Sequence, residues 1–387
     1  DPEIMDSSFG ARYISDMDRI FDTYAHLVPQ MQDFVRDQFP KHPDDGDFVY
    51  RQAVKAKAFD ALRGLLPAAS LSNVGIYGTG QAYEALLLRM RSHPLPESRY
   101  YADLMLRELR KVIPSFLERV DREDRGVVWS EYLQETREDT ADVVAALFPE
   151  GSIVDPSPTV RLVDFDPEGE VKMIASMMYP HSTMSEDQLE RRVAGMNHED
   201  RMAVARAYVG DRRNRRHKPG RALERPFYRF DVLVDYGAFR DLQRHRMLSM
   251  DWQNLSPHHG YISSPLVNAA GMGAVYEEAM ERSAALYDLL VDDFPDQASY
   301  AINLAYKIRF NMNINARSAM HLIELRTTPQ GHPSYREVGQ EMHRLIAEEA
   351  GHTVISEMMK FVDHTDETDL ERLQSERRAQ EKRQSTK

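Results

Sequence analysis

Apolar residues recur at helical spacing along most of this chain, and only two short segments alternate as β-strands do. The alternating segments are residues 160–165 (VRLVDF) and 227–234 (FYRFDVLV). Elsewhere apolar side chains return every three to four positions, as the buried face of a helix requires. We therefore expect an α/β (α+β) protein that is rich in helix and has a small central sheet.

The expected helices form two groups on either side of a linker-like segment, GSIVDPSP, which begins at Gly151. The helices expected before it are 13–39, 48–66, 81–91 and 99–120. Those expected after it are 168–178, 186–209, 236–246, 268–291, 299–325 and 335–361. This pattern divides the chain into a helical part (1–150), a strand-bearing part (151–362) and a charged tail (363–387).

The two parts share an order of features that suggests an internal repeat. Residues 67–117 and 295–358 each carry an apolar helix that ends in an LxLR-like sequence, a break with proline, and a long amphipathic helix. A shift of 235 positions places Arg91 on Arg326. Chance similarity of two helical hairpins is the alternative. If the repeat is real, the chain opens partway through its first copy.

Composition excludes several classes of site and partner. With no cysteine, the chain has no disulfide, thiolate metal site or cysteine nucleophile. This fits a cytoplasmic protein. No apolar run approaches the roughly 18 residues of a membrane span, and the first residues do not form a signal peptide, so we expect no membrane partner. The net charge of −13 disfavours a nucleic-acid partner.

Basic residues are nevertheless concentrated in two places. Residues 212–225 read RRNRRHKPGRALER, which is either a solvated basic face or an anion-binding loop. Residues 244–249 read RHRMLS, where two arginines flank a histidine. Arginine suits bidentate binding of phosphate, and histidine can bind or stack on a ring. On composition alone, a surface cluster in salt bridges explains this second group as well.

The surroundings of RHRMLS resemble the flavin-dependent thymidylate synthase (ThyX) family, whose signature has the core RHRxxS. Upstream, residues 221–230 are similar to the family's approach to an aromatic strand, with Glu224 on its glutamate. Downstream, residues 315–326 (NARSAMHLIELR) resemble its second motif. The resemblance covers about 200 residues with the motifs in order. It implies a ThyX-like tandem chain with a truncated or degenerate first domain and a complete flavin-binding second domain.

The resemblance implies the chemistry as well. Family members bind FAD, reduce it with NADPH, take a one-carbon unit from methylenetetrahydrofolate and methylate dUMP to dTMP. The positions that match the family's FAD contacts are Glu224, Arg244, His245, Arg246, Asn315, Arg317 and His321. The expected substrate contacts are Ser249, Ser256, His258 and Arg326, with Ser256 and Arg326 as catalytic residues. Family tetramers also imply that this chain forms a homodimer that acts as a pseudo-tetramer.

Departures from the family pattern fall mainly on the nucleotide side. The loop after Ser249 is about three residues longer than in the family, and His258 or His259 replaces the phosphate-binding arginine. Histidine lacks the permanent bidentate charge of arginine. Asp241 stands at an expected glutamine, Ser299 at an expected arginine, and Pro219 at a flavin-binding histidine.

The first copy departs further, because Gly80, Ala82 and Leu86 stand where the second copy has Asn315, Arg317 and His321. Three functions therefore remain open. They are thymidylate synthesis from dUMP, flavin-dependent modification of another pyrimidine, and a non-catalytic paralogue.

Other motifs are weaker. Residues 75–80 (GIYGTG) do not form a GxGxxG dinucleotide loop. The pair His258 and His259 lacks further metal ligands at suitable spacing, and we expect no metal site.

Overall fold

The computed structural model describes residues 1–43, 45–148, 157–365, 370 and 373. The chain forms two compact units, which we treat separately. Their boundaries pass through helices α2 (Gly10–Gln38) and α13 (Gly273–Leu290), so both helices contribute to each unit. Unit 1 comprises Asp1–Met17, Ala69–Pro156 and Ala285–Ala301, and unit 2 comprises Asp18–Ala68, Ser157–Ala284 and Ile302–Lys387.

The described residues of unit 1 form helices and connecting segments but no strand of the sheet. Besides parts of α2 and α13 it contains α1 (Pro2–Met5), α4 (Gly80–Arg91), α5 (Pro96–Leu109), α6 (Pro114–Leu117) and α7 (Val128–Leu147). Its helices α4 to α6 enclose a small core made of Leu87, Leu88, Ala102, Leu106, Leu117 and Val120.

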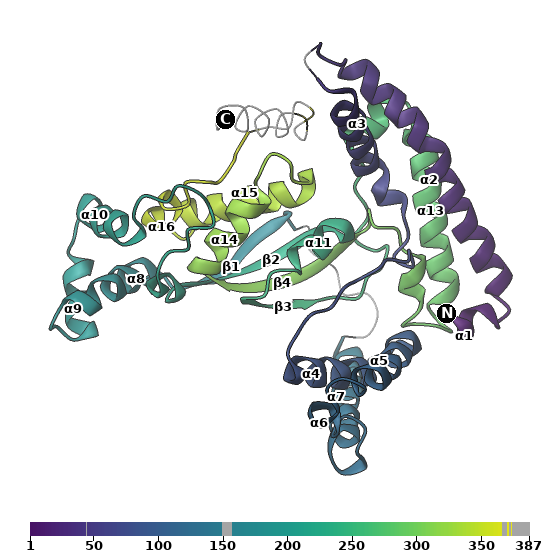
Figure 1. The fold of residues 1–387 in the computed structure, drawn as a ribbon, viewed down its shortest axis with the longest axis horizontal. Helices are drawn as coiled ribbons and strands as arrows, with labels where there is room; N and C mark the ends of the chain where they lie inside the picture. The colour runs from purple at the N-terminus through teal and green to yellow at the C-terminus, as the bar shows by residue number, and fades with distance from the viewer. Residues whose placement is uncertain (44, 149–156, 366–369, 371–372, 374–387) are drawn as a thin grey trace. The chain divides into compact units, whose positions relative to one another are not determined.

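Unit 2 is built on a four-stranded antiparallel sheet with the order β1-β2-β4-β3 (Figure 1). The strands are β1 (Val160–Phe165), β2 (Phe227–Asp235), β3 (Leu248–Trp252) and β4 (Lys307–Asn315). The small sheet expected from the sequence is therefore confirmed.

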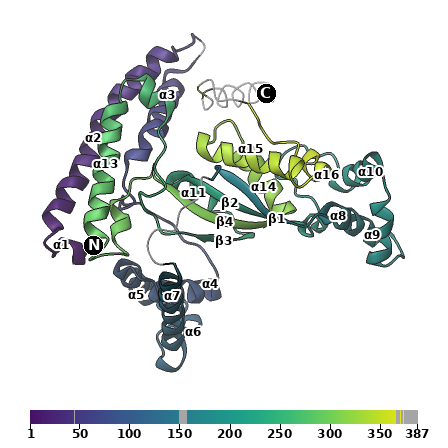
Figure 2. The same ribbon diagram turned by 180° about the vertical axis from the view of Figure 1, so that it is seen from behind.

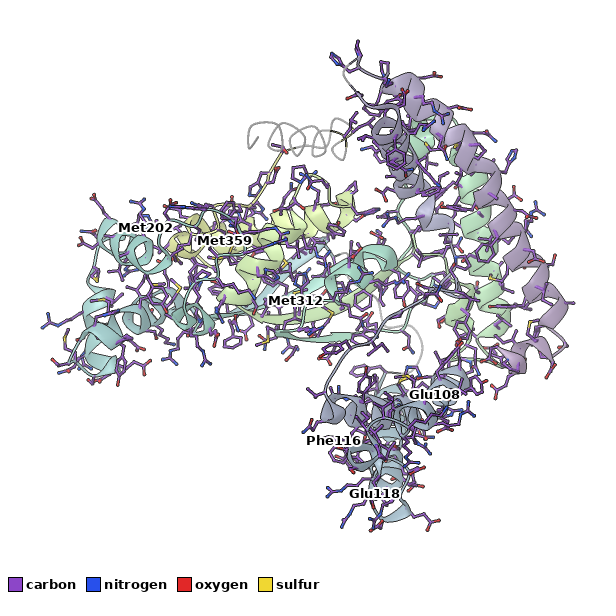
Figure 3. All side chains as sticks on the ribbon, in the orientation of Figure 1. Glu108, Phe116, Glu118, Met202, Met312 and Met359 are labelled. Atoms are coloured by element: carbon purple, nitrogen blue, oxygen red, sulfur yellow. The ribbon has the colours of Figure 1, made fainter. Side chains whose placement is uncertain are left out.

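Alternation of apolar residues fixes which face of the two central strands is buried. Phe230 and Val232 of β2 lie opposite Met312 and Phe310 of β4, and all four side chains are buried. Figure 3 marks Met312 among the side chains of the sheet. A one-residue slip of register would turn these side chains out of the core, so the pairing is strongly specified.

Helices cover one face of this sheet, and a second group of helices lies beside one of its ends. Helices α14 (Ala316–Arg326) and α15 (Pro333–Glu348) lie over one face (Figure 1). Helices α8 (Gly169–Met178), α9 (Glu186–Ala194) and α10 (His198–Val209) gather beside the end of the sheet (Figure 2). The other helices of the unit are α3 (Asp47–Leu62), α11 (Tyr236–Leu242), α12 (Pro265–Ala269) and α16 (Thr353–Glu357).

The expected helix 299–325 is wrong, because its centre is strand β4. Ile308, Phe310, Met312 and Ile314 alternate with polar residues and are all buried. That alternation is a strand pattern, but the apolar residues on both sides of it continue a helical spacing. Strand β3 was also missed, since it begins at the end of the RHRMLS segment and its residues are at most half-buried.

Other differences concern where helices end. The expected helix 186–209 is two helices, since Asn197 caps α10 three residues after α9 ends. The expected helix 99–120 ends at Leu109, and 236–246 ends at Leu242. No helix within the described part of the chain has the length and apolar character needed to span a membrane.

Candidate functional site

Strand β4 leads directly into helix α14 and delivers the second motif to the edge of the sheet. The side chain of Asn315, the last residue of β4, accepts a 2.9 Å hydrogen bond from the backbone N–H of Ser318. This N-cap fixes the start of α14. The first turn of the helix then carries Arg317, and the following turns carry His321 and Arg326.

The RHRMLS segment reaches the same place through the register of the sheet. Strand β2 ends in α11, and the chain then passes through Arg244, His245 and Arg246 into β3. Leu248, the first residue of β3, pairs with Ile314 of β4. Antiparallel pairing therefore places the start of β3 beside the end of β4, and the two motifs meet.

A cavity of about 470 Å³ lies where the motifs meet. Its volume lies within the range of small-molecule sites, about 300–1,000 Å³. The permanently basic residues that line it are Arg212, Arg215, Lys218, Arg244, Arg246, Arg317 and Arg326, and among the described residues Glu224 is its one acidic lining residue. The apolar lining consists of Met247, Leu248, Ile314, Met320 and Leu325, with Pro219. The cavity suits a ligand with both phosphate groups and a flat ring.

Arg326 and His245 form the most constrained pair in this cavity. Arg326 Nε donates a 3.0 Å hydrogen bond to His245 Nε2, so the imidazole is neutral and accepts on that nitrogen. Burial, with the charge of Arg326 and the nearby His321, lowers the pKa of His245 from 6.5 to about 4. Arg326 also lies over the ring of Tyr335, 5.1 Å from its centre. His245 thus orients the arginine, and because the imidazole is neutral it does not neutralise the arginine's positive charge.

Asp241 of α11 partly neutralises the same arginine. Its Oδ1 lies 3.5 Å from Arg326 Nη1 and 3.0 Å from Arg244 Nη1. Its backbone carbonyl accepts a further hydrogen bond from Arg326 Nη2. An anionic ligand at Arg326 therefore meets an arginine that already has a carboxylate partner.

Glu224 and Arg317 form a second ion pair in the cavity. Arg317 Nη1 donates to Glu224 Oε1 at 2.8 Å, and its Nε donates to the carbonyl of Pro219 at 2.9 Å. Desolvation raises the pKa of Glu224, but hydrogen bonds from Arg221 and Arg317 outweigh this effect and lower the pKa overall. The pair holds the loop before β2 against the first turn of α14.

The basic loop is anchored by a buried ion pair that the sequence did not indicate. Arg212 donates to both carboxylate oxygens of Glu324 on α14, at 2.7 and 2.5 Å. The Arg212 and Glu324 side chains are 3% and 0% exposed. Arg212 Nε also donates to the carbonyl of His217 at 2.8 Å. Arg212 therefore shapes the loop that carries Arg215 and Lys218 to the cavity.

The cavity brings together eight of the residues expected from the sequence and leaves three outside its lining. Those that line it are Glu224, Arg244, His245, Arg246, Asn315, Arg317, His321 and Arg326. Ser249 lies on β3 opposite Asn313, while Ser256 and His258 follow β3. The lining residues that sequence reasoning did not name singly include Arg215 and Lys218. Their signal was the basic stretch 212–225.

No group of three or more His, Asp or Glu side chains among the described residues could hold a metal ion. The chain also has no cysteine nucleophile. The described cavity can bind an anion through its arginines. The histidines beside them are largely neutral at physiological pH, and His245 orients Arg326. Burial and the charges of Lys218 and Arg215 lower the pKa of His321. Burial and the charge of Arg326 lower the pKa of His245 in the same way. Any hydride or one-carbon chemistry here needs a bound cofactor and co-substrates.

Comparison with known proteins identifies a family. The model of the thymidylate synthase complementing protein family matches residues 1–115 and 161–351. A UPF0159 protein of Chlamydia pneumoniae is 37% identical over 380 residues, which is 98% of this chain and 71% of that protein. A UPF0159 protein of Thermoplasma acidophilum is 29% identical over 400 residues, covering 96% of this chain and 76% of that protein.

The structural matches to solved proteins cover about half of this chain. The UMP/dUMP methylase PolB from Streptomyces cacaoi, bound with 5-Br dUMP, matches 51% of this chain and 94% of its own, with 18% identity and a TM-score of 0.40. Thymidylate Synthase X from Helicobacter pylori, with FAD and dUMP, matches 52% of this chain and 98% of its own, with 19% identity and a TM-score of 0.36.

Breaking the buried ion pair should destabilise the protein. Arg212→Met leaves Glu324 buried without its partner, and we expect the free energy of unfolding to fall by about 3–5 kcal/mol. The double variant Arg212→Met with Glu324→Leu should recover most of this loss, because both charges are gone. Urea denaturation measures the effect. The control Arg344→Met removes an exposed arginine that pairs with Glu341 and Glu348, and should leave the midpoint near that of the unmodified chain. A similar loss in the control would contradict the assignment.

Protonation of His245 should favour unfolding. Its pKa is about 4 in the folded protein and about 6.5 in an unfolded chain, so the unfolded state binds more protons between these values. Stability should therefore fall as the pH drops from 6.5 toward 4. In His245→Gln, which keeps an acceptor for Arg326, the urea midpoint should fall less between pH 7 and pH 5. The exposed His181→Gln serves as the control. An equal fall in all three proteins would argue against a neutral, buried His245.

Proposed function

This chain belongs to the thymidylate synthase complementing protein family, the flavin-dependent thymidylate synthases, and from that premise we propose that it binds FAD and methylates a pyrimidine nucleotide. The proposed reaction converts dUMP to dTMP, with methylenetetrahydrofolate as the one-carbon donor and NADPH as the reductant. The observation that carries the proposal is that both motifs line one cavity, and that they and the basic loop 212–218 bring seven permanently basic side chains to it.

The cavity's residues fit an FAD molecule. Arg244, Arg246 and Arg317 supply bidentate donors for a pyrophosphate. His245 and His321, whose rings lie 5.8 Å apart in an edge-on arrangement, offer hydrogen bonds and contact to a flat ring. When bound, the flavin supplies the hydride chemistry that the side chains themselves lack. The protein contributes orientation, charge and exclusion of water.

Arg326 is the proposed nucleotide-binding residue. Its guanidinium is held by His245, Asp241 and Tyr335, so its position is fixed before a phosphate arrives. A fixed donor loses little freedom when a ligand binds, which favours affinity. The roles of Ser249, Ser256 and His258 as nucleotide contacts, and of Ser256 in catalysis, stay predictions.

A second candidate is a flavoenzyme that acts on another pyrimidine nucleotide. The pairing of Asp241 with both Arg326 and Arg244 favours it, because a carboxylate at this place opposes a simple phosphate. A ligand with a donor group directed at Asp241 would instead be selected. The tandem division at residue 150 and the homodimeric pseudo-tetramer remain proposals as well, and a monomeric mass in solution would contradict the dimer.

The decisive experiment is an absorbance titration of the purified chain with FAD and then with dUMP. We expect bound flavin bands near about 450 nm, and a shift of these bands when dUMP is added. Arg317→Gln should weaken FAD binding by roughly 10- to 150-fold, the value of a charge-assisted hydrogen bond of about 1.5–3 kcal/mol. The exposed Arg192→Gln on α9 is the matched control and should bind normally.

The outcomes separate the candidates. Bound flavin with a response to dUMP supports thymidylate synthesis, and bound flavin without that response supports a different pyrimidine substrate. Absence of flavin binding would overturn both and leave a non-catalytic paralogue.

Removing the charge of Asp241 should strengthen nucleotide binding. Asp241→Asn keeps an oxygen that can accept from Arg244, but it frees the charge of Arg326 for a phosphate. We expect the Kd for dUMP to fall by about tenfold, or about 1.4 kcal/mol. The gain should shrink as salt rises, because the effect is electrostatic. The exposed Asp139→Asn on α7 controls for net charge. Weaker dUMP binding in Asp241→Asn would contradict this expectation, because it would mean that Asp241 itself contacts the nucleotide.

A further inference from the structure

The basic loop 212–218, which follows α10 (Figure 1), carries four cationic side chains besides the buried Arg212. They are Arg213, Arg215, Arg216 and Lys218. Arg215 is half-buried, and the other three are exposed. Within the part of the chain that the structure describes, none of the four has a carboxylate partner, and the acidic residue closest in sequence, Asp211, is paired with Lys360 at 3.1 Å. Four like charges in six residues repel one another, so an anionic partner is favoured.

The main chain of this loop is fixed around the guanidinium of Arg212. Arg212 Nε donates to the carbonyl of His217 at 2.8 Å, and its Nη2 donates to the carbonyl of Arg215 at 3.3 Å. Asn214 braces the same turn, since its Oδ1 accepts a 2.9 Å hydrogen bond from the backbone N–H of Arg216. The four cations are therefore carried on a fixed turn, and the loop loses little freedom when it binds a ligand.

The four cations lie partly inside and partly outside the cavity. Arg215 and Lys218 line it, and both are close enough to His321 for their charges to lower the pKa of that histidine. Arg213 and Arg216 are exposed and do not belong to the lining. The loop thus forms one basic stretch that begins at the cavity and continues beyond it.

The arginines of the two motifs differ from those of the loop, because most of them already have a carboxylate partner. Arg244 and Arg326 pair with Asp241, and Arg317 pairs with Glu224. An anion at these arginines competes with a carboxylate of the protein, whereas an anion at the loop has no such competitor among the described residues. A ligand with negative charges beyond those that the motifs bind would therefore use the loop.

The distribution of the four cations indicates the kind of anion. A single phosphate group is bound well by one bidentate arginine. Four cations, two at the cavity and two outside it, exceed that need and match a chain of anionic groups. The net charge of −13 disfavours a nucleic-acid strand as this chain. Arginine also binds carboxylates bidentately, so an oligocarboxylate fits the loop.

One ligand of the proposed function has this chemistry. Methylenetetrahydrofolate ends in a glutamate, at the end remote from its one-carbon unit, and folates are extended there by further γ-linked glutamates with one carboxylate each. The remote position means that such a tail can leave the cavity while the reacting end stays inside.

We propose that the basic loop binds the oligo-γ-glutamate tail of the folate co-substrate, with Arg215 and Lys218 at its first carboxylates and Arg213 and Arg216 at those that follow. The inference rests on the proposed function, because it takes a folate as the one-carbon donor. It adds a preference of this chain for polyglutamylated folates. Since the tail does not react, its binding lowers KM and leaves kcat unchanged.

Isothermal titration calorimetry of the chain with bound FAD tests the proposal, with tetrahydrofolate that carries one or five glutamates as the probes. We expect the pentaglutamate to bind with a Kd about tenfold lower, because each exposed ion pair contributes modestly and several form together. The difference between the two folates should shrink as salt rises, since exposed charges are screened.

The double variant Arg213→Gln with Arg216→Gln should remove most of this gain and leave the Kd of the monoglutamate unchanged. No described hydrogen bond uses either side chain, so its thermal unfolding should match that of the unmodified chain. Arg89→Gln with Arg192→Gln is the matched control. It removes the same charge from exposed positions of α4 and α9 and should keep the full gain.

The outcomes separate this inference from the function on which it rests. Equal Kd values of the two folates, or an equal gain in the loop variant, would overturn the inference and leave the folate donor in place. A chain that binds flavin but neither folate would overturn the folate donor and the inference together. Tighter binding of a single-stranded oligonucleotide than of the pentaglutamate, lost in the loop variant, would overturn the inference in favour of a nucleic-acid partner.

Discussion

The buried ion pair between Arg212 and Glu324 is the interaction on which the cavity depends. Both side chains are buried, so each charge is tolerated only while the other is in place. The pair fixes the basic loop to α14 across 112 residues of sequence. Without it, the loop that carries Arg215 and Lys218 would lose one of its two anchors to α14. An apolar pair could be as stable, but it would not place an arginine that also binds the loop's own carbonyl groups.

Local pattern predicted β1 and the central strand β2, but neither the central strand β4 nor the edge strand β3. Strands β1 and β2 were identified because β-branched and aromatic residues alternate there between polar neighbours. Strand β4 has the same alternation, but it passes into α14 with no glycine or proline at the junction. Asn315 makes that junction by capping the helix, and an asparagine within an apolar run reads equally well as part of a helix. The transition is set by pairing with β2 and β3, which single-sequence periodicity does not contain.

The content of the cavity was more predictable than its electrostatics. The two motifs carry their residues in family order, so their meeting in one cavity could be expected. The ion pairs could not, because Asp241 and Arg326 are 85 residues apart and meet only through the fold. The lowered pKa of His245 has the same origin, since burial and Arg326 cause it and neither is local to RHRMLS. The residue types therefore predicted that the cavity attracts an anionic ligand. The fold determines which of the arginines are already paired with a carboxylate of the protein.

The arginines that end α4 and α14 illustrate this difference within one chain. Arg91 Nη1 donates to Asp103 of the next helix, α5, at 2.6 Å. The arginine is therefore paired with a carboxylate of its own helical hairpin. Arg326 meets the aromatic ring of Tyr335 on the next helix instead, and its nearest carboxylate comes from α11. An aromatic ring orients a guanidinium without occupying its hydrogen-bond donors. Both helices thus end in an arginine that is paired with a carboxylate, but it is Arg326 that also lines the cavity described above.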